Sequence, residues 1–142
     1  MIVLLTLIFG VIEVSWSVYA FHWIANSAHE GARYAIVRGN SWTGSCASFG
    51  SSQCKASTTD IANYVASRGV LGISIDPTLD VCVQYFSTVP SSTSTTCTAN
   101  TSPNGPGNIV QVTVTHPFTL NIPGVPTKTF NLKSTSQMVI AQ

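Results

Sequence analysis

The side chains best suited to acid–base or nucleophilic chemistry are few in this sequence and stand far apart. Histidine occurs at His22, His29 and His116, and the first two fall in the N-terminal stretch. A hydrolase needs a nucleophile beside a positioned base, and the sequence has no nucleophile elbow, P-loop, zinc-protease or dinucleotide motif. The acids Asp76 and Asp80 flank a proline and are expected to cap a turn. We therefore expect no enzyme activity, no catalytic residue and no cofactor.

The four cysteines are the other residues with chemistry of their own. Their spacing contains no Cys-x-x-Cys pair, so no zinc or other metal site is expected. Four cysteines allow three disulfide connectivities. We favour the sequential connectivity, Cys46 with Cys54 and Cys82 with Cys97. It would cross-link two polar loops that have few apolar residues to stabilise them. Disulfides imply an oxidising compartment outside the cytoplasm.

The composition excludes several classes of protein. The chain has 142 residues, of which 44% are apolar and 8% are charged, whereas an ordinary soluble domain carries about 25% charged residues. Disordered chains combine low hydrophobicity with high charge, so disorder is not expected. The net charge is +1 and the basic residues are scattered, so no basic surface for nucleic acid is expected either.

The apolar residues concentrate at the N-terminus. Residues 1–25 contain one formally charged side chain, Glu13, and a membrane-spanning helix needs about 20 predominantly apolar residues. The segment lacks the order of a cleavable secretory signal and continues without proline to Arg38 and Gly39, which form a helix stop signal. We expect one helix over residues 2–38, about 55 Å long, and an exposed globular domain over residues 39–142.

One face of the expected helix combines small and polar residues. Spacings of three and four residues bring them to a common seam, and small residues let helices approach closely in membranes. We therefore expect this seam to be a subunit-packing face. It consists of Thr6, Gly10, Glu13, Ser17, Ala20, Ile24, Ser27 and Gly31.

Glu13 is the one acid within the apolar part of this helix. An acid embedded in an apolar helix is costly unless it has a partner, so it marks a functional contact. The candidate partners are Arg33 or Arg38 of a neighbouring subunit, the amino group of another subunit's Met1, and the hydroxyl of Ser17.

Residues 5–38 resemble the N-terminal helix of TadE-like and TadG-like proteins, the pseudopilin relatives of tight-adherence pilus systems. The family motif is carried by Glu30, Gly31, Ala32, Arg33 and Tyr34, and residues 108–140 are similar to the closing strands of the family. The resemblance implies a pilin-like helix that lies in a membrane before assembly and in a filament core afterwards. The other matching residues are Phe9, Gly10, Glu13, Asn26, Ala28 and Ala35.

The remainder of the sequence predicts a small α+β domain. Ser57 and Asp60 form a capping-box pattern for a short helix that ends before Gly69. Alternating apolar residues predict strands over 79–86, 109–115 and 128–133, which we expect to form a three-stranded antiparallel sheet. The polar tract between the first two strands is expected to be an exposed loop, and it contains Cys97 and a possible glycosylation site at Asn100.

These features predict a structural subunit of an extracellular pilus-like filament that serves surface attachment. Its expected partners are further copies of itself, the inner membrane before assembly and the pilus assembly machinery, and no nucleic acid. Two alternatives remain: a minor TadE-like pseudopilin that primes assembly of a pilus or secretion machine, and a membrane-anchored extracellular binding domain.

Overall fold

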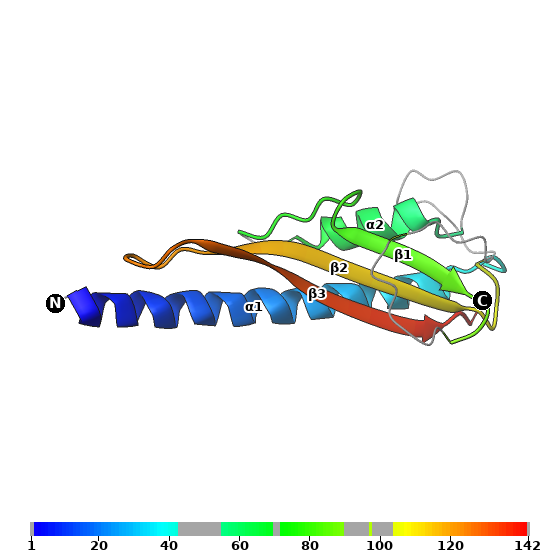
Figure 1. Ribbon diagram of the computed structural model, residues 1–142. Coiled ribbons are helices and arrows are strands. Elements are labelled where there is room, and N and C mark those ends of the chain that lie inside the picture. Colours follow the sequence, from blue (N-terminus) through cyan, green and yellow to red (C-terminus); the bar gives the residue numbers. More distant parts are fainter. Residues whose placement is uncertain (1, 43–54, 70–71, 90–96, 98–103, 142) are drawn as a thin grey trace.

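The computed structural model describes residues 2–42, 55–69, 72–89, 97 and 104–141. Two helices and three strands follow one another along the chain, and the long first helix runs beneath the sheet (Figure 1). The α+β architecture predicted from the sequence is therefore confirmed. The elements are α1 Ile2–Val37, α2 Thr58–Ser67, β1 Val81–Phe86, β2 Ile109–Leu120 and β3 Lys128–Val139.

Helix α1 has 36 residues and is therefore about 54 Å long. It contains no proline, and it ends where the sequence predicts, because Arg38 follows the last helical residue and Gly39 begins a turn. The N–H of Arg38 donates to the carbonyl of Ala35 over 3.3 Å and closes this last turn.

Helix α2 begins with the predicted capping box. The backbone N–H of Asp60 donates to the Ser57 hydroxyl over 3.1 Å, and the Asp60 carboxylate accepts the N–H of Ser57 over 3.0 Å. Both donors would otherwise be unsatisfied at a helix N-terminus. The helix buries Ile61, Ala62 and Val65, which hold it against α1 and the sheet.

The sheet has the order β1-β2-β3 with both pairs antiparallel. Strands β2 and β3 have 12 residues each and are longer than the predicted 109–115 and 128–133. Polar pairs occur in the added part of each strand: Thr135 and Gln137 of β3 bond Thr113 and Gln111 over 2.9 and 2.7 Å, and in the added part of β2 the hydroxyls of Thr119 and Thr129 lie 3.0 Å apart. Apolar alternation alone does not detect such a polar ladder.

The core lies between the helices and one face of the sheet. Val110, Val112 and Val114 of β2 are completely buried there, and the alanines of α1 that face them, Ala28 and Ala32, are buried as well. Alanine side chains keep the distance between helix and sheet short. The C-terminal end of the chain is fixed to the same helix, because the N–H of Ala141 donates to the Ile36 carbonyl over 3.3 Å.

Cys82 of β1 and Cys97 form a disulfide, as the sequence predicts. This bond ties the polar tract after β1 to the edge strand of the sheet. Cys46, Cys54 and Asn100 lie outside the described residues, and their predicted disulfide and glycosylation stay predictions.

Candidate functional site

The N-terminal half of α1 presents a continuous apolar surface. Every large apolar side chain from Val3 to Phe21 is exposed, with 78% of Val3 and 64% of Leu7 accessible. An exposed apolar patch of this extent marks an interaction or membrane surface. Within the described residues, α1 is the one helix long and apolar enough to cross a bilayer. We call the exposed and partly exposed side chains of residues 3–21, all but the buried Ala20, the exposed helix surface.

The threonine and serine hydroxyls of the exposed helix surface are satisfied within the helix itself. Thr6 donates to the carbonyl of Val3 over 2.9 Å, and Ser15 donates to the carbonyl of Val11 over 2.7 Å. Ser17 donates to its own preceding turn in the same way. These side chains therefore bring no unsatisfied donor into an apolar environment.

The predicted subunit-packing face divides into two parts. Its second half, Ala20, Ile24, Ser27 and Gly31, is buried inside this chain. A Cβ atom at Gly31 would lie 2.6 Å from Cγ2 of Val65 and 3.2 Å from Cγ1 of Val112, so the missing side chain is what lets α1, α2 and β2 meet.

The first half of that face consists of Thr6, Gly10, Glu13 and Ser17, which are partly exposed. No atom of another element lies within 4 Å of a Cβ placed at Gly10. This half is open to a neighbour, and its packing against another subunit stays a prediction.

Glu13 forms no ion pair with another described residue. The Ser17 hydroxyl, one candidate partner from the sequence, donates instead to the Val14 carbonyl over 2.9 Å. Arg33 pairs with Glu30 of its own chain over 3.3 Å. Arg38 donates to the Tyr34 hydroxyl. The carboxylate therefore lies on the exposed helix surface without a described cation beside it.

The residues of the family motif are structural in this fold. Gly31 and Ala32 are buried at the contact with the sheet and α2. The Glu30–Arg33 pair is solvent-exposed, and such a pair contributes about 0.3 to 0.5 kcal/mol on a helix. Tyr34 stacks on Tyr64 of α2, with ring centroids 4.3 Å apart.

This stack is extended at both ends by arginine, an arrangement that the sequence reasoning missed. The guanidinium of Arg38 lies 4.7 Å from the Tyr34 ring centroid, and that of Arg68 lies 4.8 Å from the Tyr64 ring centroid. A signal was present, because Tyr-x-x-x-Arg occurs in both helices and places each arginine one turn after its tyrosine.

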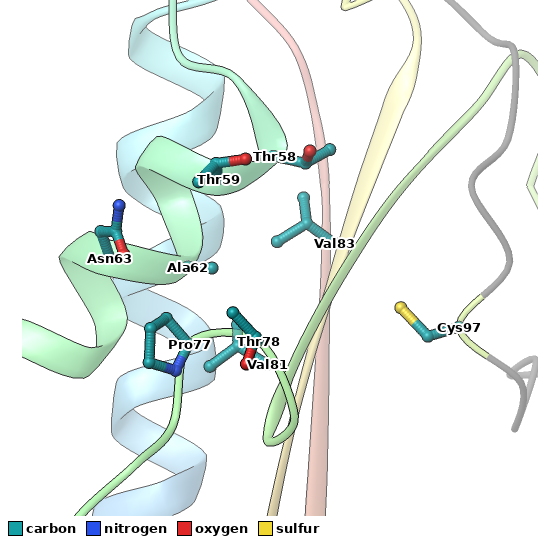
Figure 2. Close-up of a pocket in the computed structure, with 9 residues that line it drawn as sticks. All are labelled: Thr58, Thr59, Ala62, Asn63, Pro77, Thr78, Val81, Val83 and Cys97. Atoms are coloured by element: carbon teal, nitrogen blue, oxygen red, sulfur yellow. The ribbon is translucent and has the colours of Figure 1, made fainter. Parts of the chain in front are cut away.

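A cavity of about 420 Å³ opens between α2, the turn before β1 and β1 itself (Figure 2). It offers hydroxyl, amide and apolar contacts, but none of the described residues that line it is an acid or a base that would activate a hydroxyl. No group of three metal-ligating side chains occurs among the residues that the structure describes. The lining residues are Thr58, Thr59, Ala62, Asn63, Pro77, Thr78, Val81, Val83 and Cys97.

The family model of TadE-like proteins matches residues 1–33 of the chain. This N-terminal segment is similar to TadE-like proteins. The match covers Glu13 and the motif residues from Glu30 to Arg33, and it confirms the resemblance over this helix. The match covers 33 of the 142 residues, and none of the globular part lies within it. The tail over 108–140 lies outside the TadE-like match, so its likeness to the family stays a prediction.

No curated protein and no solved structure matches the chain. Similarity to known proteins is therefore found for residues 1–33. The globular part is described from the contacts in its own structure.

Proposed function

We propose that this chain is a structural subunit of an extracellular pilus-like filament, polymerising through the N-terminal half of α1. The observation that carries the proposal is the division of α1 into two parts. Its C-terminal part is buried against the sheet and α2, whereas every large apolar side chain from Val3 to Phe21 is exposed. Exposed apolar side chains are unfavourable in water, so this surface needs an apolar environment to cover it.

A bilayer before assembly and neighbouring helices after assembly both supply that environment. Burying one Leu, Ile or Phe side chain stabilises by about 1.5 to 3 kcal/mol, and the exposed helix surface carries many such side chains. Contacts between several neighbours would therefore hold a polymer together without covalent links. The satisfied hydroxyls of Thr6, Ser15 and Ser17 suit both environments.

The open half of the packing face supports close helix contact. A Cβ placed at Gly10 would meet no atom within 4 Å, and small residues on a membrane helix allow backbones to approach. The TadE-like match over residues 1–33 covers this same segment. In this proposal the globular part faces outward and mediates surface attachment.

The test is immunogold electron microscopy of filaments sheared from cells that produce the chain, with antibodies against residues 104–141. Labelling along the whole filament, with the chain as the main component by mass spectrometry, supports the subunit role. Labelling confined to filament tips, or a chain that remains in the membrane fraction while filaments form, supports the priming pseudopilin instead. Absence of any filament that depends on the chain would overturn both roles.

A further inference from the structure

A second pocket, of about 500 Å³, lies between the middle of α1 and the C-terminal end of α2. Its volume falls within the range of about 300 to 1,000 Å³ that is typical of small-molecule sites. It lies on α1 beyond the exposed helix surface, and it shares no lining residue with the cavity in Figure 2. The described residues that line it are Trp23, Asn26, Ser27, Glu30 and Arg68.

Three polar side chains of α1 bring unused hydrogen-bonding groups to this pocket. The side chains of Trp23, Asn26 and Ser27 form no hydrogen bond with another described residue. Ser27 is only 3% exposed, and a hydroxyl this buried is costly without a partner. The pocket wall therefore favours a polar group in the space that it encloses.

Arg68 is fixed in position on the α2 side of the pocket. Its guanidinium lies 4.8 Å from the Tyr64 ring centroid and donates to the Tyr64 hydroxyl over 2.7 Å. A guanidinium has five N–H groups, so this contact orients the side chain and leaves donors for a ligand. A side chain that is already ordered loses less entropy when it binds.

Glu30 supplies hydrogen-bond acceptors to the same pocket. Its Oε1 accepts from Arg33 over 3.3 Å, and its Oε2 has no hydrogen bond with another described residue. The lining thus contains one carboxylate and one guanidinium. Because these charges cancel, the pocket favours a neutral polar ligand over an ion.

The lining matches the two kinds of surface that a sugar ring presents. A pyranose has hydroxyls at its edge, each of which donates and accepts hydrogen bonds, and C–H groups on its faces. The partly exposed indole of Trp23 offers a flat apolar surface to those C–H groups. Amide, carboxylate and guanidinium groups are planar and can bind two neighbouring hydroxyls at once.

We propose that this pocket is a binding site for a neutral sugar ring. Trp23 packs against the face of the ring, and the four polar side chains of the lining bind its hydroxyls. The proposal rests on the proposed function, because it names a saccharide as the target of surface attachment. It gives the globular part of each subunit one sugar site, between its two helices.

The first test measures binding by the full chain in micelles of a detergent that has no sugar headgroup. The ligands are the methyl glycosides of glucose, galactose and mannose, and glycerol is the control because it has hydroxyls but no ring. We expect saturation-transfer NMR to show that at least one glycoside binds, in the millimolar range typical of a ligand this small. Binding of no glycoside overturns the proposal, as does equal binding of glycerol.

A pair of asparagine variants locates the sugar. Asn26→Ala removes an amide from the pocket and should weaken binding several-fold. Asn63→Ala removes an equally exposed amide from α2, in the cavity of Figure 2, and should leave the affinity unchanged. The opposite result would place the sugar in that other cavity and overturn the proposal.

Two further variants separate binding from folding. Ser27→Ala should weaken binding several-fold without lowering the free energy of unfolding, because the hydroxyl has no described partner within the chain. Trp23→Leu keeps apolar bulk but loses the flat ring, so binding should be lost in a chain that urea unfolding shows to be folded. Full affinity in either variant would overturn the site.

Filament assembly separates this proposal from the proposed function. Filaments that contain the chain throughout but bind no glycoside overturn the sugar site and leave the subunit role in place. A chain that binds a glycoside through this pocket but forms no filament supports the site and contradicts the subunit role.

Discussion

Tyr34 of α1 and Tyr64 of α2 stack with ring centroids 4.3 Å apart and an interplanar angle of 16°. Each ring also lies beneath the arginine that follows one turn later, Arg38 and Arg68. The arginines donate to the same tyrosine hydroxyls, over 3.0 and 2.7 Å. The column of four side chains therefore joins α2 to the long helix through aromatic and cation–π contacts.

Tyr64→Ala should lower the free energy of unfolding by about 2 kcal/mol, because it removes the aromatic pair and the ring under Arg68. Tyr64→Phe is the matched control. It keeps the ring stack and loses only the hydroxyl bonded to Arg68, so we expect a loss of about 0.5 to 1 kcal/mol. Urea unfolding of the full chain in detergent micelles measures both. Equal losses for the two variants would show that the stack itself contributes nothing.

The Cys82–Cys97 disulfide should contribute substantially to the stability of the fold. The two cysteines are 15 residues apart, and closing a loop of that length stabilises by about 3 kcal/mol in the chain-entropy model. The double variant Cys82→Ala/Cys97→Ala should lose that amount in urea unfolding. Val89→Ala, an exposed change in the same loop, should stay within about 0.5 kcal/mol of the parent. A double variant as stable as the parent would contradict this role.

Tyr85 should make the fold sensitive to alkaline pH. Burial, and then the charge of Asp60, raise the pKa of Tyr85 from 10.0 to about 12. Above pH 10 the unfolded chain loses this proton while the folded chain keeps it. The contribution of Tyr85 to stability is therefore complete below pH 10 and is lost as the pH rises through about 12.

Tyr85→Phe removes this titration together with a 3.3 Å hydrogen bond to the Ala56 carbonyl. The variant should be slightly less stable than the parent at pH 8, and its stability should fall less between pH 10 and pH 12. Urea midpoints measured across this range for both proteins give the comparison. If the urea midpoints of the variant and the parent fall equally with pH, the pKa of Tyr85 is the same in the folded and unfolded chains.

Much of this fold is predictable because local signals and tertiary contacts agree. The helix stop at Arg38 and Gly39, the Ser57–Asp60 capping box and the Cys82–Cys97 pairing are all confirmed. Strands β2 and β3 are longer than predicted, because their added parts contain polar cross-strand pairs, such as Thr119 with Thr129 and Gln137 with Gln111, that apolar periodicity does not detect.

The division of the small-residue face of α1 was not predictable from spacing. Small residues admit any close partner, whether a second helix or the chain's own sheet, and the sequence gives no way to tell these apart. The structure shows the sheet and α2 at Gly31 and no described neighbour at Gly10. The contact at Gly31 can be predicted only when the position of the β2–β3 hairpin is known, and the residues of that hairpin are distant from the helix in sequence.

Gly31 and Gly10 should respond oppositely to the same substitution. Gly31→Ala places a methyl group 2.6 Å from Val65, and overpacking of this kind costs about 1 to 3 kcal/mol. Gly10→Ala meets no atom and gains about 1 kcal/mol of helix propensity. Urea unfolding should therefore show a destabilised Gly31 variant and an unchanged or stabilised Gly10 variant.

Gly10 also offers a test of assembly that is separate from folding. Gly10→Leu adds apolar bulk to the open half of the packing face, so membrane insertion should persist while filament yield falls. Val18→Leu, an apolar enlargement on the same exposed helix surface but off that face, is the control. Filament yield is measured in the sheared fraction. Equal yields for the two variants would argue against close helix packing at Gly10.

Glu13 should be needed for assembly and dispensable for the fold. Its carboxylate has no ion pair with a described residue, so Glu13→Ala should leave urea unfolding within about 0.5 kcal/mol of the parent. In a filament core the same change would leave a partner cation buried and unpaired, which costs about 3 to 5 kcal/mol per contact. Filament yield in the sheared fraction should therefore fall sharply while the chain accumulates in the membrane.

Glu13→Gln distinguishes an ion pair from a neutral hydrogen bond as the contact that Glu13 makes in the assembly. If the partner is a cation of a neighbouring subunit, glutamine removes the charge and filament yield falls as it does for alanine. If the partner is a hydrogen-bonding group, glutamine retains most of the yield because its amide still accepts and donates. Normal filament yield from both variants would show that Glu13 has no partner in the assembly.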